Sequence, residues 1–391
     1  MGMRGGYLPR PPLKFRNGTA PTPRLGFQEG LKPLKGPTRA EVALVKPAPS
    51  ELRTLVESLV HGASWYGGLE DWFQLQVDVE EAEASELEDT DIAIAAVPDE
   101  ELVEYELDPY LPLKRQLSQK GIPSQMIAYS TLNQAQNPYI LFNLALSVYA
   151  KCGGVPWTVD KPPISHLTVG VDTAYRGQQT AAASLWIADW GQSLSWNLHP
   201  AQRERVNLAE AVEQACREAA EKTARKPKVI HVHRDGLVHP QEADQAAKAI
   251  QQLAHQGIVH PEPEYTILSV RKASPPRIFS RTPRGLRAAD KGAFIELTST
   301  LGVVMTTGHP EIPSTLPPPK PLVVEVADTN NWEKPLQQHL QEVYWLSELH
   351  WASGLRSAKL PITTLYPHRI AKFTAAGVKP HKNLRTKLWF L

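Results

Sequence analysis

Residues 229–236 read VIHVHRDG, and this stretch decides how the rest of the chain is interpreted. Its first half is rich in apolar, β-branched side chains, as is typical of a buried strand. Asp235 follows at the end of that strand, and Gly236 comes directly after it. Because Asp-Gly is a common turn dipeptide, the stretch alone leaves two interpretations of Asp235 open. It is either a catalytic carboxylate at the edge of a sheet or only the start of a turn.

Strand-like and helix-like segments alternate along the chain, with a boundary at Pro162 and Pro163. Residues 92–98 form an apolar run of the kind found in buried parallel strands. This alternation predicts an α/β fold whose first domain is Rossmann-like. Residues 1–40 are rich in Pro, Gly and Arg and indicate an extended arm. We expect strands at 41–47, 73–79, 92–98, 166–177, 181–191, 229–236 and 265–273, and helices at 49–64, within 108–121, and at 137–154, 204–224, 242–257, 335–353 and 362–377.

The composition restricts the class of protein. A chain of 391 residues suggests two domains or three, and its hydrophobic fraction of 42% is ordinary for a soluble globular protein. It has no run of eighteen apolar residues, so we expect no membrane span, and its N-terminus lacks the apolar region of a secretory signal. Cys152 and Cys216 belong to no CxxC or Cys/His cluster, which argues against a zinc site or disulfide framework and suits the cytoplasm.

Charge is distributed unevenly although the net charge is only +1. Residues 349–391 contain eight Lys or Arg and no Asp or Glu, whereas acidic residues gather in 79–107. A polyanionic partner needs a local basic surface rather than a basic whole. The alternative interpretation is a solvated basic tail and an acidic loop.

Two aspartates end neighbouring strand patterns. Asp172 closes LTVGVD, and Asp235 closes VIHVHRD. If both strands lie side by side, paired carboxylates face one edge, as two Mg²⁺ ions about 3.5–4 Å apart require for phosphodiester cleavage. Glu204, which we expect at the start of the intervening helix, and His368, in LYPHRIAKF, are candidates to complete the set. Alternatively, Glu204 is a solvated helix-start acid, and His368 is a surface residue.

Several separated motifs together resemble the MID–PIWI half of Argonaute proteins. They are NLALSVYAKCGGVPW, HLTVGVD, KPKVIHVHRDG, YTILSVRKASPPRIF, LPITTLYPHRIAKF and LRTKLWFL, in the family's order from about residue 40 to the end. The resemblance implies an arm (1–40), a MID-like guide-binding domain (41–162) and an RNase H-like PIWI domain (163–391). We expect no room for N and PAZ domains, and in this the chain resembles the short prokaryotic Argonautes.

The resemblance also implies site residues. Asp172, Asp235 and His368 match the family's metal ligands for Mg²⁺ or Mn²⁺, and Glu204 is the candidate for the mobile glutamate. The match of Glu204 is looser, because Arg203 also lies close to the expected spacing. The residues that would bind the guide's 5′ phosphate are Tyr110, Lys114, Gln125 and Lys151, with a Mg²⁺ held by the terminal carboxylate of Leu391. Where some relatives have another lysine, this chain has Ser147. Lys272, Arg277 and Arg356 would contact guide backbone phosphates.

We therefore expect a cytoplasmic protein that binds a small guide RNA or DNA, pairs it with a complementary target and cleaves the target strand in prokaryotic defence. The alternative is a catalytically silent guide-binding subunit that works with a separate effector protein. A third possibility, an unrelated RNase H-like nuclease, leaves Tyr110, Lys114, Gln125 and Lys151 unexplained. The sequence does not distinguish RNA from DNA as guide or target.

Overall fold

The computed structural model describes residues 4–99, 108–160, 165–176, 179–202, 205–272, 276–283, 285–311 and 317–391. The chain divides into two compact units. Unit 1 comprises Met1–Pro11, Lys161–His350 and Arg356–Lys372, and unit 2 comprises Pro12–Asp160, Trp351–Leu355 and Phe373–Leu391. Each unit is described by itself.

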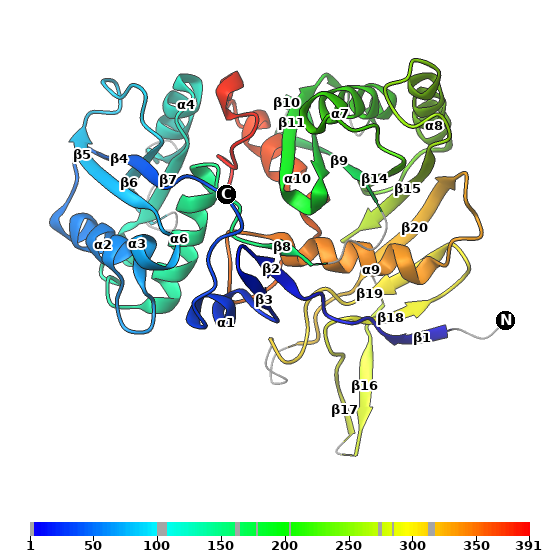
Figure 1. The fold of residues 1–391 in the computed structure, drawn as a ribbon, viewed down its shortest axis with the longest axis horizontal. Helices are drawn as coiled ribbons and strands as arrows, with labels where there is room; N and C mark the ends of the chain where they lie inside the picture. Colours follow the sequence, from blue (N-terminus) through cyan, green and yellow to red (C-terminus); the bar gives the residue numbers. More distant parts are fainter. Residues whose placement is uncertain are drawn as a thin grey trace. The chain divides into compact units, whose positions relative to one another are not determined.

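Unit 1 is built on a nine-stranded sheet in the order β1-β18-β19-β20-β15-β14-β9-β10-β11 (Figure 1). At its centre β14 runs parallel to both β9 and β15, while β10 and β11 continue from β9 as antiparallel neighbours. The strands are β1 (Arg4–Tyr7), β9 (Leu167–Arg176), β10 (Gln179–Ala188), β11 (Ser193–His199), β14 (Val229–Asp235), β15 (Glu264–Arg271), β18 (Ala293–Glu296), β19 (Leu301–Val304) and β20 (Leu322–Thr329). A separate hairpin of β16 (Phe279–Thr282) and β17 (Gly285–Ala288) projects from this unit.

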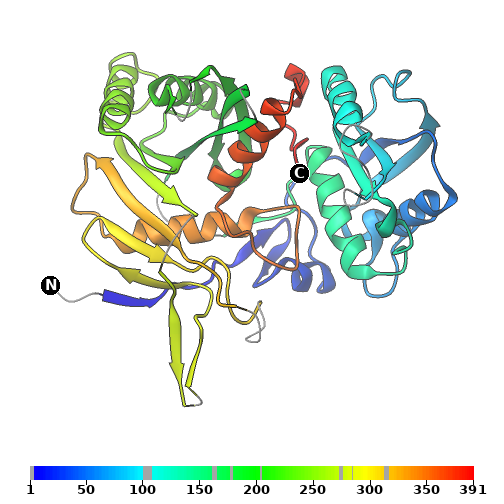
Figure 2. The same cartoon turned by 180° about the vertical axis from the view of Figure 1, so that it is seen from behind.

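The two faces of the central strands have different partners. Ile230 and Val232 of β14 belong to an apolar core shared with α7 (Leu208–Thr223) and α8 (Pro240–His255). Because side chains alternate along a strand, His231 and His233 point to the opposite face. There α9 (Leu336–Leu346) crosses the sheet, and α10 (Ile362–Ala375) lies beside it (Figures 1 and 2). The site residues of β14 therefore share the polar face.

Unit 2 contains a four-stranded, all-parallel sheet in the order β5-β4-β6-β7. Its strands are β4 (Arg39–Val45), β5 (Gln76–Ala82), β6 (Ile92–Val97) and β7 (Ser124–Ala128), and its helices are α1 (Pro23–Gln28), α2 (Ser50–His61), α3 (Gly68–Trp72), α4 (Tyr110–Lys120), α5 (Tyr129–Leu132) and α6 (Pro138–Lys151). Leu117 of α4 packs against alanines of β4 and β6 on one face of this sheet, and Figure 1 shows α2, α3 and α6 on the other. A smaller sheet joins β3 (Gly18–Ala20), β2 (Leu13–Phe15) and β8 (Thr158–Val159).

Four expectations need correction. Asp172 does not end its strand, because β9 continues to Arg176 and pairs with β10 over that whole length. The helix expected at 204–224 begins only at Leu208, where the side chain of Asn207 accepts a hydrogen bond from the amide of Glu210. The segment expected as an extended arm contains the helix α1 and the β2–β3 hairpin. Residues 12–40 were expected in the arm and residues 373–391 in the second domain, but both segments belong to unit 2.

Two further structural features bear on the expectations. The strands expected around 92–98 and 229–236 are present as β6 and β14. Within the described residues, none of the helices is long and apolar enough to cross a lipid bilayer.

Candidate functional site

The sheet of unit 1 brings Asp172 and Asp235 to adjacent positions. In the parallel β9–β14 pair, Val171 lies opposite Arg234, so the next residue along each strand is an aspartate. Both carboxylates are buried, with 4% and 9% of the residue surface exposed. The Asp-Gly turn also exists, since Gly236 has a φ of 100° directly after the strand. Asp235 therefore lies at the end of a strand and directly before a turn, and its catalytic role stays a prediction.

Helix α10 brings His368 to the same place because Gly170 leaves room for it. A Cβ on Gly170 would stand 1.6 Å from the carbonyl oxygen of Thr363 in the first turn of α10. The helix can therefore lie against the backbone of β9. One turn further on, His368 Nδ1 lies 2.8 Å from Asp172 Oδ2. Ligand atoms of Asp172, Asp235 and His368 all lie within 4.8 Å of one another.

Two cations already contact these carboxylates. Lys272, which follows β15, donates from Nζ to Asp235 Oδ2 at 3.0 Å, and Arg234 Nη1 lies 3.2 Å from Asp172 Oδ1. Burial and the neighbouring Asp172 raise the pKa of Asp235, while Lys272 and His368 oppose that rise. Two carboxylates and an imidazole form a donor set that suits Mg²⁺ or Mn²⁺. Binding would require Lys272 to release Asp235, and its side chain, 43% exposed, has room to move.

Glu204, the fourth predicted member, lies outside the described residues, as does Arg203. The residues on either side pair as the short strands β12 (Ala201–Gln202) and β13 (Arg205–Val206). The prediction for Glu204 therefore stays a prediction.

A second group of predicted residues gathers in unit 2. Lys151, at the end of α6, donates from Nζ to Gln125 Oε1 at 2.6 Å. Lys114 of α4 donates to the carbonyl oxygens of Trp389 at 2.6 Å and Ser124 at 3.3 Å. Both lysines are almost fully buried, and burial lowers the pKa of Lys114 to about 7. A buried lysine held by neutral oxygens favours an anionic ligand that restores its charge.

The aromatic member and the chain terminus adjoin this group. The ring of Tyr110 stacks on Phe373 at 6.5 Å with an interplanar angle of 13°. Phe373 in turn contacts Trp389, over which Lys114 Nζ lies. Leu391 follows the buried residues Trp389 and Phe390, and its amide donates to Leu388. Ser147, where some relatives have a lysine, is buried in α6.

The predicted backbone-binding residues lie in unit 1 among other cations. Lys359 Nζ donates to the carbonyl oxygen of Lys272 at 3.0 Å. Burial, then Lys320, Arg277 and Lys272, lower the pKa of Lys359, so these four side chains form one basic cluster. The sequence interpretation missed Lys359 and Lys320, although the excess of basic residues after 349 pointed to part of this surface.

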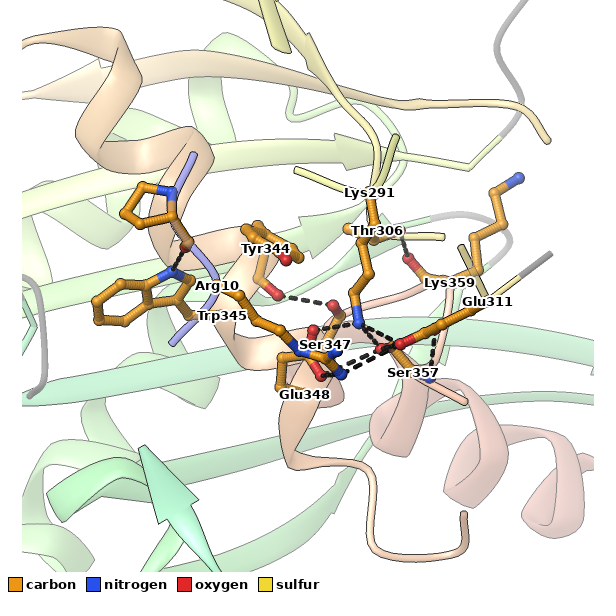
Figure 3. Close-up of polar contacts among 11 residues, drawn as sticks. Arg10, Lys291, Thr306, Glu311, Tyr344, Trp345, Ser347, Glu348, Ser357 and Lys359 are labelled. Carbon is orange, nitrogen blue, oxygen red and sulfur yellow. Dashed lines mark hydrogen bonds and ion pairs between the residues drawn. The ribbon is translucent and has the colours of Figure 1, made fainter. Parts of the chain in front are cut away.

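Arg356 is the third residue predicted to contact the guide backbone. The next residue, Ser357, belongs to a buried cluster of ion pairs (Figure 3). In that cluster Lys291 Nζ contacts Glu348 and Ser357 and lies 3.0 Å from Glu311 Oε1. Arg10 of the N-terminal segment lies 3.1 Å from the same Glu311 oxygen. Two cations and two carboxylates thus balance in charge while holding the chain beside Arg356.

Comparisons with known proteins agree with this architecture. A family model described as "Piwi domain" matches residues 102–379. "Protein argonaute" of Synechococcus elongatus is 29% identical over 264 residues, 64% of this chain and 34% of that protein. "Protein argonaute" of Aquifex aeolicus is 25% identical over 313 residues, 76% of this chain and 40% of that protein. This chain therefore spans less than half the length of these curated relatives.

A solved structure, "Clostridium butyricum Argonaute bound to a guide DNA (5' deoxycytidine) and a 19-mer target DNA", matches 97% of this chain and 54% of its own. The TM-score is 0.78 and the identity 22%, a likeness that concerns the fold alone. Together with the family match, it confirms the predicted α/β fold of MID–PIWI type.

Proposed function

Because the chain belongs to the Piwi domain family, we propose that it binds a 5′-phosphorylated guide, pairs it with a complementary nucleic acid and cleaves that target strand. The observation that carries this proposal is the meeting of Asp172, Asp235 and His368 within 4.8 Å on one face of the sheet. Defence against foreign nucleic acid in a prokaryotic cytoplasm is the corresponding biological role.

In this proposal Asp172, Asp235 and His368 hold the metal, with Glu204 as the fourth member of the set. When bound, Mg²⁺ or Mn²⁺ activates the attacking water and stabilises charge on the phosphodiester. His368 bonds Asp172 through Nδ1, which orients the imidazole and that carboxylate. Arg234 holds the other oxygen of Asp172. Once Lys272 leaves Asp235, its ammonium is free to bind a backbone phosphate.

The guide's 5′ end is assigned to the group around Lys114 in unit 2. Lys114 and Lys151 supply positive charge, and Gln125 donates an amide hydrogen bond to the phosphate. Tyr110 offers a flat face for the first base. The terminal carboxylate of Leu391 would hold a Mg²⁺ at the same phosphate.

Sequence choice would come from base pairing, because contacts to backbone phosphates carry no sequence information. Lys272, Arg277 and Arg356 are proposed to contact the guide backbone, together with Lys359 and Lys320 of the same basic cluster. Either RNA or DNA suits such contacts.

The test is a cleavage assay with 5′-phosphorylated guides and labelled complementary targets, each as RNA and as DNA, in Mn²⁺. We expect one product cut within the paired region, lost in Asp172→Ala while guide binding persists. Asp244→Ala is the matched control, because Asp244 is an exposed carboxylate on α8 that forms a surface ion pair with Lys248. The proposed nuclease activity would be contradicted if no guide and target combination gave a product, or if Asp172→Ala cut the target as the wild type does.

A second candidate function is a silent guide-binding subunit that acts with a separate effector protein. It is favoured by one observation: Lys272 and Arg234 neutralise both aspartates without a metal. Guide binding without cutting, together with a partner protein that co-purifies in fixed stoichiometry, would support this candidate over the nuclease.

A further inference from the structure

A second cluster of possible metal ligands lies in unit 1, away from the strand ends. His231 and His233 come from the polar face of β14, and Glu342 comes from α9. None of the three has any exposed surface. One ligand atom of each lies within 4.8 Å of the others, as in the aspartate site. Neither the family resemblance nor the proposed function assigns a role to this cluster.

The donor atoms converge on Glu342. His231 Nδ1 lies 2.8 Å from Glu342 Oε2, and His233 Nε2 lies 3.9 Å from Glu342 Oε1. In a tetrahedral zinc site with bonds of about 2.0–2.2 Å, ligand atoms lie about 3.3–3.6 Å apart. The two separations here lie on either side of that spacing, so small side-chain shifts would bring the three atoms to it.

The surroundings orient the ligands as the outer shell of a metal site does. His233 Nδ1 is 2.8 Å from Thr363 Oγ1, so donation to that hydroxyl leaves a lone pair on Nε2. Ser165 Oγ donates to Glu342 Oε1 at 2.9 Å, and Thr168 donates to the same oxygen at 3.4 Å. His233 and Glu342 are therefore each held by a neighbouring hydroxyl group.

The protein by itself leaves this cluster incompletely satisfied. Among the described residues, the buried atoms His231 Nδ1, His233 Nε2 and Glu342 Oε2, which face one another, have no hydrogen bond of acceptable geometry. Buried polar groups of this kind are rare in folded proteins and call for an explanation such as an ion.

We propose that His231, His233 and Glu342 bind one divalent transition-metal ion, best matched by Zn²⁺, at a structural site separate from the aspartates. His339, whose ring centroid is 5.4 Å from that of His231, is the nearest candidate for a fourth ligand. Such an ion would fasten β14, which carries Asp235, to α9. The competing description is a metal-free His231–Glu342 ion pair.

Metal content tests the proposal directly on the full chain. The protein is stripped with a chelator, exposed to excess Zn²⁺, passed through gel filtration and analysed for zinc by mass spectrometry. We expect one Zn²⁺ per chain in the wild type and in Asp172→Ala/Asp235→Ala, which lacks the aspartate ligands. We expect less than a tenth of that in Glu342→Gln. Wild-type protein that retains no zinc, or zinc lost from the double aspartate variant but kept by Glu342→Gln, would overturn the proposal.

A second measurement covers the case in which Glu342→Gln does not fold. Titration of the stripped wild type with Co²⁺ reports geometry, because tetrahedral nitrogen and oxygen ligands give visible absorption far stronger than octahedral oxygen sites. We expect a saturating visible band at one Co²⁺ per chain, displaced by Zn²⁺ and unchanged in Asp172→Ala/Asp235→Ala. Only weak octahedral absorption would mean that the ion pair is metal-free.

Discussion

If Lys114 binds the 5′ phosphate of the guide as proposed, its low pKa makes guide binding sensitive to pH. Burial lowers that pKa to about 7 in the free protein, and a bound phosphate dianion would raise it again. Above pH 7, binding must therefore draw a proton from solution, and affinity should fall by up to tenfold per pH unit. Anisotropy titrations of a 5′-phosphorylated oligonucleotide from pH 7 to 9 measure this slope. The 5′-hydroxyl form should lack it.

Lys114→Met should weaken binding of the phosphorylated guide and abolish this pH slope. Lys120→Met is the matched control, since Lys120 ends the same helix and donates to the backbone oxygens of Ser85 and Leu87. An unchanged slope in Lys114→Met would remove this lysine from the phosphate site.

If Asp235 binds a metal ion as proposed, Lys272 competes with that ion for the carboxylate. Its ammonium is 3.0 Å from Asp235 Oδ2 and is partly exposed, so the contact is worth about 1 kcal/mol at most. Lys272→Met should therefore tighten Mn²⁺ binding at the aspartate site by up to about fivefold, as measured by calorimetry without nucleic acid. Arg271→Met, one residue earlier and paired with Glu325, should leave Mn²⁺ affinity unchanged. Weaker binding in Lys272→Met would mean that Lys272 supports the site rather than competing for it.

At the scale of elements, the contact between β9 and α10 sets the position of His368. Gly170→Ala would put a methyl group 1.6 Å from the Thr363 carbonyl oxygen, so α10 must move away from the sheet. Overpacking of this kind typically costs about 1–3 kcal/mol, and the displaced His368 should reduce cleavage more than guide binding. Thermal unfolding and single-turnover cleavage measure the two effects.

Gly6→Ala, in the edge strand β1, is the control for that substitution. There the nearest atom is the flexible edge of Phe294 at 3.2 Å, so stability and cleavage should stay near wild type. If Gly170→Ala matched this control in both measurements, the close approach of α10 would not govern the site.

The elements that could be predicted from the sequence are those whose pattern lies within a few neighbouring residues. The apolar runs of β6 and β14 stand out within a few residues, and both are present. Asp172 was expected at a strand end because the following residues are polar. These residues instead continue β9 to Arg176 and pair with β10, the next strand along the chain. The polar side chains do not mark how far this hairpin extends. The start of α7 depends on the cap at Asn207 rather than on the apolar period that began earlier.

In the candidate site too, residues within local motifs could be predicted from the sequence, and contacts between distant residues could not. Asp235 and His368 could be proposed from motifs, since each lies in a recognisable local pattern. The pairs Lys272–Asp235 and Arg234–Asp172 join residues 37 and 62 positions apart, and no local pattern encodes them. The glycine that admits α10 and the glutamate that faces His231 are similarly determined by packing between elements.

For the whole molecule, the net charge is only +1, but acidic and basic residues gather in different parts of the chain. If guide strands are bound through the basic cluster of unit 1, affinity should fall steeply with salt. Each lost phosphate contact to a single strand should reduce the log–log salt slope by about 0.7. Arg277→Gln should therefore lower the slope by about that amount and weaken all guide sequences equally, because backbone contacts do not read bases.

Arg225→Gln supplies the comparison for the salt slope, since Arg225 is exposed in the same unit but paired with Asp189, outside the basic cluster. Anisotropy titrations of one guide in 50–400 mM salt, repeated with an unrelated guide sequence, measure both variants. A wild-type slope in Arg277→Gln would exclude it from the guide path. A loss confined to one guide sequence would indicate a base contact, and specificity would then no longer rest on pairing alone.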